Sequence, residues 1–119
     1  MSNVNIIELK GSVYFIKFKD GSKAYLVVEE ENNKMYLIET YTPKQHRGKG
    51  YARMLVEKAI EDAEKKGLSL VPICSYAVYY FMKNPTKRYI LSDEYMNLSD
   101  KDWEKLFKRR LEEERRKRS

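Results

Sequence analysis

The fold of this chain is decided by residues 35–74, MYLIETYTPKQHRGKGYARMLVEKAIEDAEKKGLSLVPIC. They begin with an apolar, β-branched run and change to a helical pattern, in which apolar residues recur every three or four positions over 52–63. Gly67 is a helix stop before a second apolar run, Leu68–Cys74. A strand, a helix and a strand at this spacing predict a βαβ unit, in which Met35–Tyr41 and Leu68–Cys74 lie parallel.

Two further β-like runs precede this unit. Val13–Lys19 and Ala24–Glu30 are rich in β-branched and aromatic residues, and the pairs Asp20-Gly21 and Asn32-Asn33 are reversal signals after them. These runs predict an antiparallel meander that leads into the βαβ unit, and a helix is expected over Ser75–Lys83. The predicted class is therefore α/β (α+β), with a mixed sheet.

The last part of the chain differs in composition from the rest. A narrow apolar stripe crosses it, formed by Trp103, Leu106, Phe107 and Leu111. Nothing apolar remains from Glu112 onward. We predict one domain over 1–91 and a basic C-terminal helical extension over 92–119, whose first half docks and whose last half frays. The stripe also allows a homodimer through this extension.

Composition excludes several classes of protein. With 119 residues, 42% of them hydrophobic, the chain is long enough for one packed core. No apolar run approaches the roughly 20 residues that cross a bilayer. One cysteine (Cys74) excludes an internal disulfide framework, and one histidine (His46) leaves too few ligands for a zinc site. Because the first residues also lack a secretory pattern, we expect a cytoplasmic protein that has no membrane partner.

The net charge of +6 suits partners that carry phosphate. The basic tail raises nucleic acid or an acidic membrane as partners, but the interleaved acids Glu112–Glu114 would repel phosphates, which disfavours this interpretation.

The loop Gln45–Ala52, between the predicted strand and the predicted helix, carries the most chemical information. A helix start offers unpaired N–H groups and a positive dipole end, and both attract anions. Gly48 and Gly50 let the backbone approach a pyrophosphate closely and adopt positive φ. The alternative is a basic turn that only caps a helix.

The Q/R-x-x-G-x-G/A signature, filled by Gln45, Gly48 and Gly50, resembles the acetyl-CoA pyrophosphate loop of GNAT-type N-acetyltransferases. Residues 40–85 resemble the small, minimal GNAT-like family, which reads roughly T-x-V-P-x-x-x-R-G-x-G-[IY]-[AG] and then V-P-x-C-[PS]-[FY]-x-x-x-[YF]. The resemblance implies a GNAT-like fold, acetyl-CoA as cofactor, and acetyl transfer to a small-molecule or peptide amine. The transfer would occur directly or through an acyl-cysteine. A non-catalytic acyl-CoA-binding module is the alternative function.

The resemblance also implies where the coenzyme binds. Backbone amides around Arg47–Ala52 would hold the pyrophosphate, and pantetheine would pair with the strand near Tyr41, in a gap beside Leu68–Cys74. Pro72 supports such a gap because proline cannot donate to a ladder, although it also fits an outward-facing bulge. The candidate coenzyme-binding residues are Tyr41, Thr42, Gln45, His46, Arg47, Gly48, Lys49, Gly50, Tyr51, Ala52, Arg53, Tyr76 and Lys83.

Three residues are candidate catalytic groups. Cys74 matches the V-P-x-C position and is either a nucleophile, with its pKa lowered by the helix that begins at Ser75, or a buried small hydrophobe. Glu39 stands where GNAT enzymes often keep a base, although the small family frequently has histidine there, and it is otherwise an exposed strand carboxylate. Tyr80 is the candidate proton donor, with Tyr76 and Tyr79 as rivals and core packing as the alternative.

Overall fold

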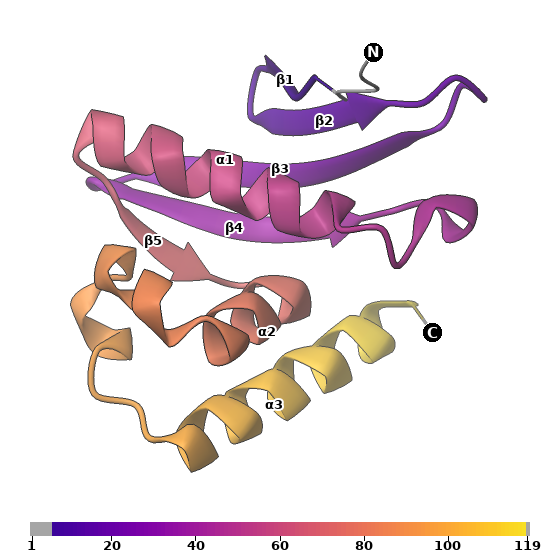
Figure 1. The fold of residues 1–119 in the computed structure, drawn as a ribbon. Helices are drawn as coiled ribbons and strands as arrows, with labels where there is room; N and C mark the ends of the chain where they lie inside the picture. Colours follow the sequence, from indigo (N-terminus) through magenta and orange to yellow (C-terminus); the bar gives the residue numbers. More distant parts are fainter. Residues whose placement is uncertain (1–5, 119) are drawn as a thin grey trace.

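The computed structural model describes residues 6–118 and arranges them as a mixed sheet with helices packed on it (Figure 1). In chain order the elements are β1 (Glu8–Lys10), β2 (Val13–Lys17), β3 (Lys23–Glu31), β4 (Lys34–Tyr41), α1 (Tyr51–Lys66), β5 (Ser69–Pro72), α2 (Ser75–Lys83) and α3 (Asp100–Arg118). Short 3-10 turns lie at Lys44–His46, Pro85–Ile90 and Asp93–Tyr95. The strand order is β1-β2-β3-β4-β5. Only β4 and β5 are parallel among these described strands, so the meander and the βαβ unit are confirmed.

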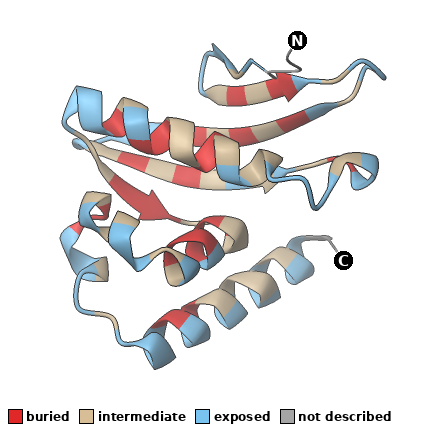
Figure 2. Ribbon diagram, in the orientation of Figure 1, coloured by how far each residue is buried: buried red, intermediate tan, exposed pale blue. Residues whose placement is uncertain are grey.

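One face of the sheet and the apolar face of α1 form most of the core. Tyr14 and Ile16 on β2 are buried, while their neighbours along the strand are not, as the alternation of a half-buried strand requires. The buried side of α1 is the one that the helical period predicts, and it consists of Leu55, Val56, Ala59, Ile60 and Ala63. On the strands that α1 covers, Figure 2 shows the buried positions as bands that alternate with less buried ones.

Two strands are shorter than their apolar runs. β2 ends at Lys17 because the N–H of Phe18 already donates to Ser22 O at 2.9 Å, across the turn. β5 ends at Pro72 because the next two N–H groups, of Ile73 and Cys74, both donate to Leu37 O, at 3.1 and 3.0 Å. Because β5 ends at Pro72, the chain separates from β4 beyond this residue.

A β-bulge on β4 coincides with the point where β4 and β5 part. On the β3 side, Val27 pairs with Glu39 and Val28 pairs with Leu37, so that Ile38 between them is unpaired. On the β5 side, pairing covers Lys34–Leu37 only. Among the described strands, residues 38–41 of β4 therefore have no partner on that side.

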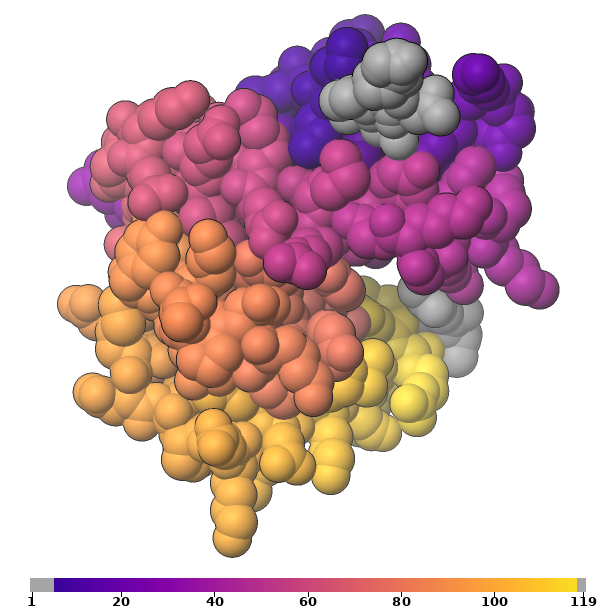
Figure 3. All heavy atoms as spheres, viewed as in Figure 1, coloured from indigo at the N-terminus to yellow at the C-terminus, as the bar shows by residue number. Residues whose placement is uncertain are grey.

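The C-terminal helix is continuous, and the expectation that its last half frays is wrong. Trp103 is 0% exposed and Leu106 5%, so the predicted stripe does dock. The helix runs on to Arg118 because Glu114, more than two turns after Leu106, hydrogen-bonds the start of α2. Figure 3 shows α3, in yellow, packed along α2, with its last turns on the same side of the molecule as the magenta loop before α1. The division into 1–91 and 92–119 remains a prediction.

Candidate active site

The loop before α1 has the backbone shape that its glycines permit. Gly48 has φ 79° and Gly50 has φ 86°, both in the left-handed region that a side chain disfavours. Gly50 is the N-cap of α1, and no side chain caps the helix there. Arg47 Nε donates to Thr42 O at 2.9 Å and ties the middle of the loop to the residue that follows β4.

Most N–H groups of this turn have no acceptor among the described residues. Met54 N–H donates to the carbonyl oxygen of Gly50, the N-cap of α1, at 3.1 Å. Within residues 6–118, no acceptor receives a hydrogen bond from the backbone N–H of Gly48, Lys49, Gly50, Ala52 or Arg53. The first turn of α1 also carries no acid. The turn thus presents donors and a positive field, the two features that bind an anion.

A hollow of about 500 Å³, called the loop hollow below, lies against these N–H groups. Its lining joins the loop, the end of β4 and the start of α2, and consists of Thr40, Tyr41, Thr42, His46, Arg47, Gly48, Gly50, Tyr51, Ala52, Arg53, Ser75, Tyr76 and Glu114. Besides Tyr76, nine of the residues predicted to bind the coenzyme therefore lie together in this lining.

The turn between β2 and β3 contacts the loop before α1 and supports it. The His46 ring stacks on Phe18, with centroids 3.7 Å apart, and its Nε2 lies 2.8 Å from Asp20 Oδ2. Gln45 Nε2 donates to the same oxygen at 3.2 Å. The Gln45 and His46 side chains therefore hold the loop in place.

A second hollow of about 270 Å³, called the strand gap below, opens where β4 and β5 part. Pro72, the last residue of β5, is buried rather than facing outward at a bulge. The strand gap shares five lining residues with the loop hollow, namely Thr40, Tyr41, Ser75, Tyr76 and Glu114. Its other lining residues are Ile38, Glu39, Cys74 and Lys117. An elongated ligand can thus reach from the loop into the gap.

Cys74 lies in the strand gap but is not activated as expected. Its side chain is 4% exposed, and Sγ lies 3.1 Å from Thr40 Oγ1. Burial raises the pKa of the thiol, and it outweighs the lowering effect of hydrogen bonds from Thr40 and the Ala77 backbone. The prediction that the pKa of Cys74 is lowered is therefore wrong: the Ala77 backbone at the start of α2 does act to lower it, but burial outweighs this effect, and a nearby carboxylate adds to the rise.

That carboxylate belongs to Glu114, which sequence reasoning missed. Its Oε2 accepts a hydrogen bond from Ser75 N at 2.7 Å, and its Oε1 accepts one from Ser75 Oγ at 2.6 Å. Glu114 lines both hollows. No local pattern predicts a contact between residues 39 positions apart. The charged run EEERRKRS instead resembles a solvated helix end.

Glu39 also lies in the strand gap, on the exposed end of β4. Its Oε2 accepts a hydrogen bond from Tyr25 Oη at 3.0 Å, and burial and this carboxylate raise the pKa of the Tyr25 phenol. A carboxylate so placed retains lone pairs with which to take a proton.

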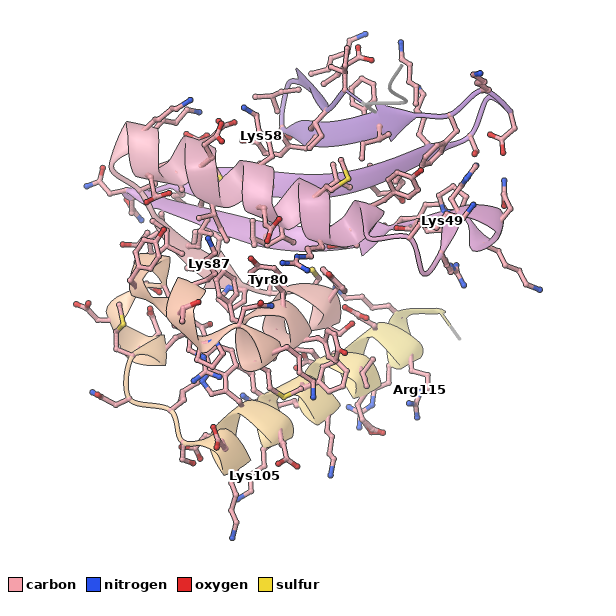
Figure 4. The ribbon with its side chains drawn as sticks, in the orientation of Figure 1. Lys49, Lys58, Tyr80, Lys87, Lys105 and Arg115 are labelled. Atoms are coloured by element: carbon pink, nitrogen blue, oxygen red, sulfur yellow. The ribbon has the colours of Figure 1, made fainter. Side chains whose placement is uncertain are left out.

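The three tyrosines of α2 occupy different surroundings. Tyr80 is 2% exposed, and its hydroxyl donates to Glu57 Oε2 at 2.9 Å, between α1 and α2 (Figure 4). Burial and the Glu57 carboxylate raise the pKa of this phenol. Tyr76 lines both hollows, Tyr80 lines neither, and Tyr79 is 40% exposed beside Phe107. The structure therefore brings Tyr76, and not Tyr80, to the candidate site.

Besides Gln45, whose side chain contacts Asp20, two predicted coenzyme contacts lie outside the hollows. Lys83 is at the far end of α2, with Nζ 5.7 Å from the centre of the Tyr79 ring. The Lys49 side chain lies at the outer edge of the loop, away from α2 (Figure 4). Neither residue lines the loop hollow or the strand gap.

Two kinds of feature are absent from the described residues. No helix among them combines the length and the apolar character needed to span a membrane. Within the same residues, no group of three or more His, Cys, Asp or Glu side chains is arranged to hold a metal ion.

Comparison with known proteins agrees with this geometry. The chain is similar to an NMR solution structure of a GCN5-like protein from Staphylococcus aureus, described as a candidate N-acetyltransferase. The TM-score is 0.63 at 19% sequence identity, and the match covers 82% of this chain and 100% of that one, which shows the GNAT-like fold. The sequence model of the family described as GCN5-related N-acetyl-transferase matches residues 13–90, about two thirds of the chain. The chain belongs to the GCN5-related N-acetyltransferase family.

Proposed function

We propose that this protein is an acetyl-CoA-dependent N-acetyltransferase that acts on a small-molecule or peptide amine. The observation that carries the proposal is that the N–H groups of Gly48, Gly50 and Ala52, which have no acceptor within residues 6–118, lie beside a hollow that continues into the strand gap. A site for a small anion alone would need no such continuation. The acceptor, the cytoplasmic location and a homodimer remain predictions.

The residues present fit coenzyme A. Its diphosphate needs several hydrogen-bond donors in a positive field, and the N–H groups of Gly48, Gly50 and Ala52 supply them. Arg47 and Arg53 add guanidinium groups to the same lining. Beyond the diphosphate, the coenzyme carries amides, for which the unpaired edge of β4 over 38–41 offers backbone partners.

The coenzyme supplies an acetyl thioester, and the chain supplies groups that handle protons. Glu39, in the strand gap, is the candidate acceptor of the proton that an ammonium group must lose. Tyr76 is the candidate proton donor. Burial raises the pKa of its phenol, so that the hydroxyl is protonated at neutral pH. The half-buried lining also limits the access of water, which would compete with the amine.

Turnover is tested with the full chain, acetyl-CoA and a panel of amines, peptides and polyamines, by following the release of free thiol. We expect at least one amine to support turnover. Tyr76→Phe should then lower kcat on the order of 100-fold. Tyr79→Phe is the matched control on the same helix, since it lines neither hollow, and it should behave as the wild type.

Binding and turnover separate the alternatives. If calorimetry shows acetyl-CoA binding but no amine in the panel is acetylated, the non-catalytic acyl-CoA-binding module is favoured. If neither acetyl-CoA nor CoA binds, both functions are excluded. If Tyr79→Phe lowers kcat as much as Tyr76→Phe, the role given to Tyr76 is wrong.

A further inference from the structure

We propose that the face of the sheet opposite α1 binds the acceptor, and that the acceptor is an arylalkylamine, in which a short alkyl chain joins a neutral aromatic ring to a primary amine. The ring of this acceptor lies on three aromatic side chains, Phe15, Tyr25 and Tyr41, called the aromatic row below. Its ammonium group meets Glu39 at the strand gap. This substrate class rests on the proposed function, which leaves the acceptor open.

The aromatic row crosses β2, β3 and β4, which lie side by side (Figure 1). Phe15 of β2 pairs directly with Tyr25 of β3, and Tyr25 pairs with Tyr41 of β4. Ala24 and Leu26, on either side of Tyr25, are fully buried in the core that α1 covers, so the Tyr25 ring points to the opposite face. The Tyr25 and Tyr41 rings lie 5.4 Å apart between centroids, and Tyr41 is 41% exposed. The row therefore offers ring surface to a ligand.

The β-bulge at Ile38 brings Glu39 and Tyr41 to this face. Leu37 is fully buried in the core, and unbroken alternation along β4 would turn Glu39 and Tyr41 the same way as Leu37. The bulge shifts the register by one residue, so that Tyr41 lies opposite Tyr25 and Glu39 shares its face. Both residues belong to the part of β4 that lies beyond its pairing with β5. They therefore lie where an amine can enter the strand gap from the face opposite α1.

Glu39 connects the aromatic row to the strand gap. Glu39 and Tyr41 both line the gap. Glu39 Oε2 accepts a hydrogen bond from Tyr25 Oη at 3.0 Å, so the carboxylate lies at the edge of the row. A carboxylate has about four lone-pair sites and can accept from an ammonium group as well. An amine bound to Glu39 thus leaves its alkyl chain and its ring beside Tyr25 and Tyr41.

The charges around the row favour a neutral ring over a second cation. The ammonium groups of Lys17 and Lys23 lie 5.8 and 5.4 Å from the centre of the Phe15 ring, and Lys117 lines the strand gap. A polyamine with its reacting amine in the gap would bring its other ammonium groups toward these lysines. Glu114 also lines the gap, but both of its oxygens already accept hydrogen bonds at the start of α2. Tyrosine rings pair favourably with another aromatic ring, stacked or edge to face.

The test compares two amines of similar shape, phenethylamine and cyclohexylethylamine, as acceptors for the full chain with acetyl-CoA. Only the first has an aromatic ring, and the contact with the row should lower its KM about 2- to 10-fold relative to the second. Tyr41→Leu keeps an apolar side chain without a ring. It should abolish this difference and leave the Kd for CoA unchanged, since the coenzyme is expected to pair with the backbone of β4.

Tyr36→Leu is the matched control. Tyr36 lies on the same strand between two buried residues, so it shares the outer face, and it lines neither hollow. This variant should keep the difference between the two amines. A difference that survives in Tyr41→Leu, or that is lost equally in both variants, overturns the inference.

Amine binding without turnover gives a second readout. When phenethylamine is titrated into the ¹⁵N-labelled full chain, with CoA and without it, we expect ring-current shifts at the amides of Tyr25 and Tyr41 and smaller ones at Tyr36. If no amine is acetylated, the proposed function fails, while these shifts still decide whether the row binds an aromatic amine. Shifts that avoid Tyr25 and Tyr41, an equal KM for the two amines, or a lower KM for the diamine cadaverine than for phenethylamine overturn the inference.

Discussion

The substitution Gly50→Ala separates the binding role of the loop from its role in stability. Gly50 has φ 86° and nothing within 4 Å of the position that a Cβ would take, so the cost of alanine is backbone strain rather than a clash. A left-handed conformation costs a non-glycine residue about 1–2 kcal/mol. For a domain of this size that corresponds to a fall in Tm of roughly 4–8 °C.

Gly67→Ala is a matched control at the other end of α1. Gly67 has φ 71° and an equally open Cβ position, so alanine costs a similar amount of stability there. Its N–H is already bonded within the protein, at the C-cap of α1. We therefore expect the two variants to lose similar stability in thermal unfolding.

The two variants should differ in coenzyme binding. If the backbone at residue 50 relaxes toward negative φ, the neighbouring N–H groups turn away from the diphosphate. Each hydrogen bond to a charged group contributes about 1.5–3 kcal/mol, so the loss of one raises Kd by roughly 10- to 150-fold. Calorimetry with CoA should show this for Gly50→Ala and an unchanged Kd for Gly67→Ala. Wild-type affinity in both variants, or equal loss in both, would refute the reasoning.

Three further predictions concern the support of the site. Trp103→Ala should lower the free energy of unfolding by about 3–5 kcal/mol in urea titrations, because the indole is fully buried between α3 and the core. Burial and the hydrogen bond to Asp62 raise the pKa of Tyr14. In urea titrations at increasing pH, the free energy of unfolding should therefore stay constant up to about pH 10 and fall above it, and it should fall less steeply in Tyr14→Phe. Asp20→Asn weakens the contact to the His46 ring, and it should raise the Kd for CoA roughly two- to fivefold without a change in Tm.

Local patterns in the sequence were sufficient to predict the fold. The period of two in β2 and the apolar positions 52–63 define the meander and the crossover helix, because strands and helices bury their faces at different spacings. The position of the loop follows from the same reading, since Gly48 and Gly50 stand between a strand and a helix and both adopt positive φ.

What the sequence did not predict depends on tertiary contacts. The helical period does not say which turn of α2 faces the strand gap, so the sequence alone does not distinguish Tyr76, which lines the gap, from Tyr80, which bonds Glu57. The surroundings of Cys74 depend on its burial in the folded chain and on Glu114, which reaches the neighbouring Ser75 only after α3 has packed along α2. The bulge at Ile38 leaves no signal in a run of apolar residues.

The most direct measurement is a CoA titration of the ¹⁵N-labelled full chain followed by amide chemical shifts. We predict saturable shifts that are largest at Gly48, Gly50 and Ala52, whose N–H groups have no acceptor in the described part of the chain, and small shifts at Gly67, whose N–H is bonded. Shifts confined to the outer side of α3, where Lys105 and Arg115 project (Figure 4), with the loop amides unmoved, would contradict the account.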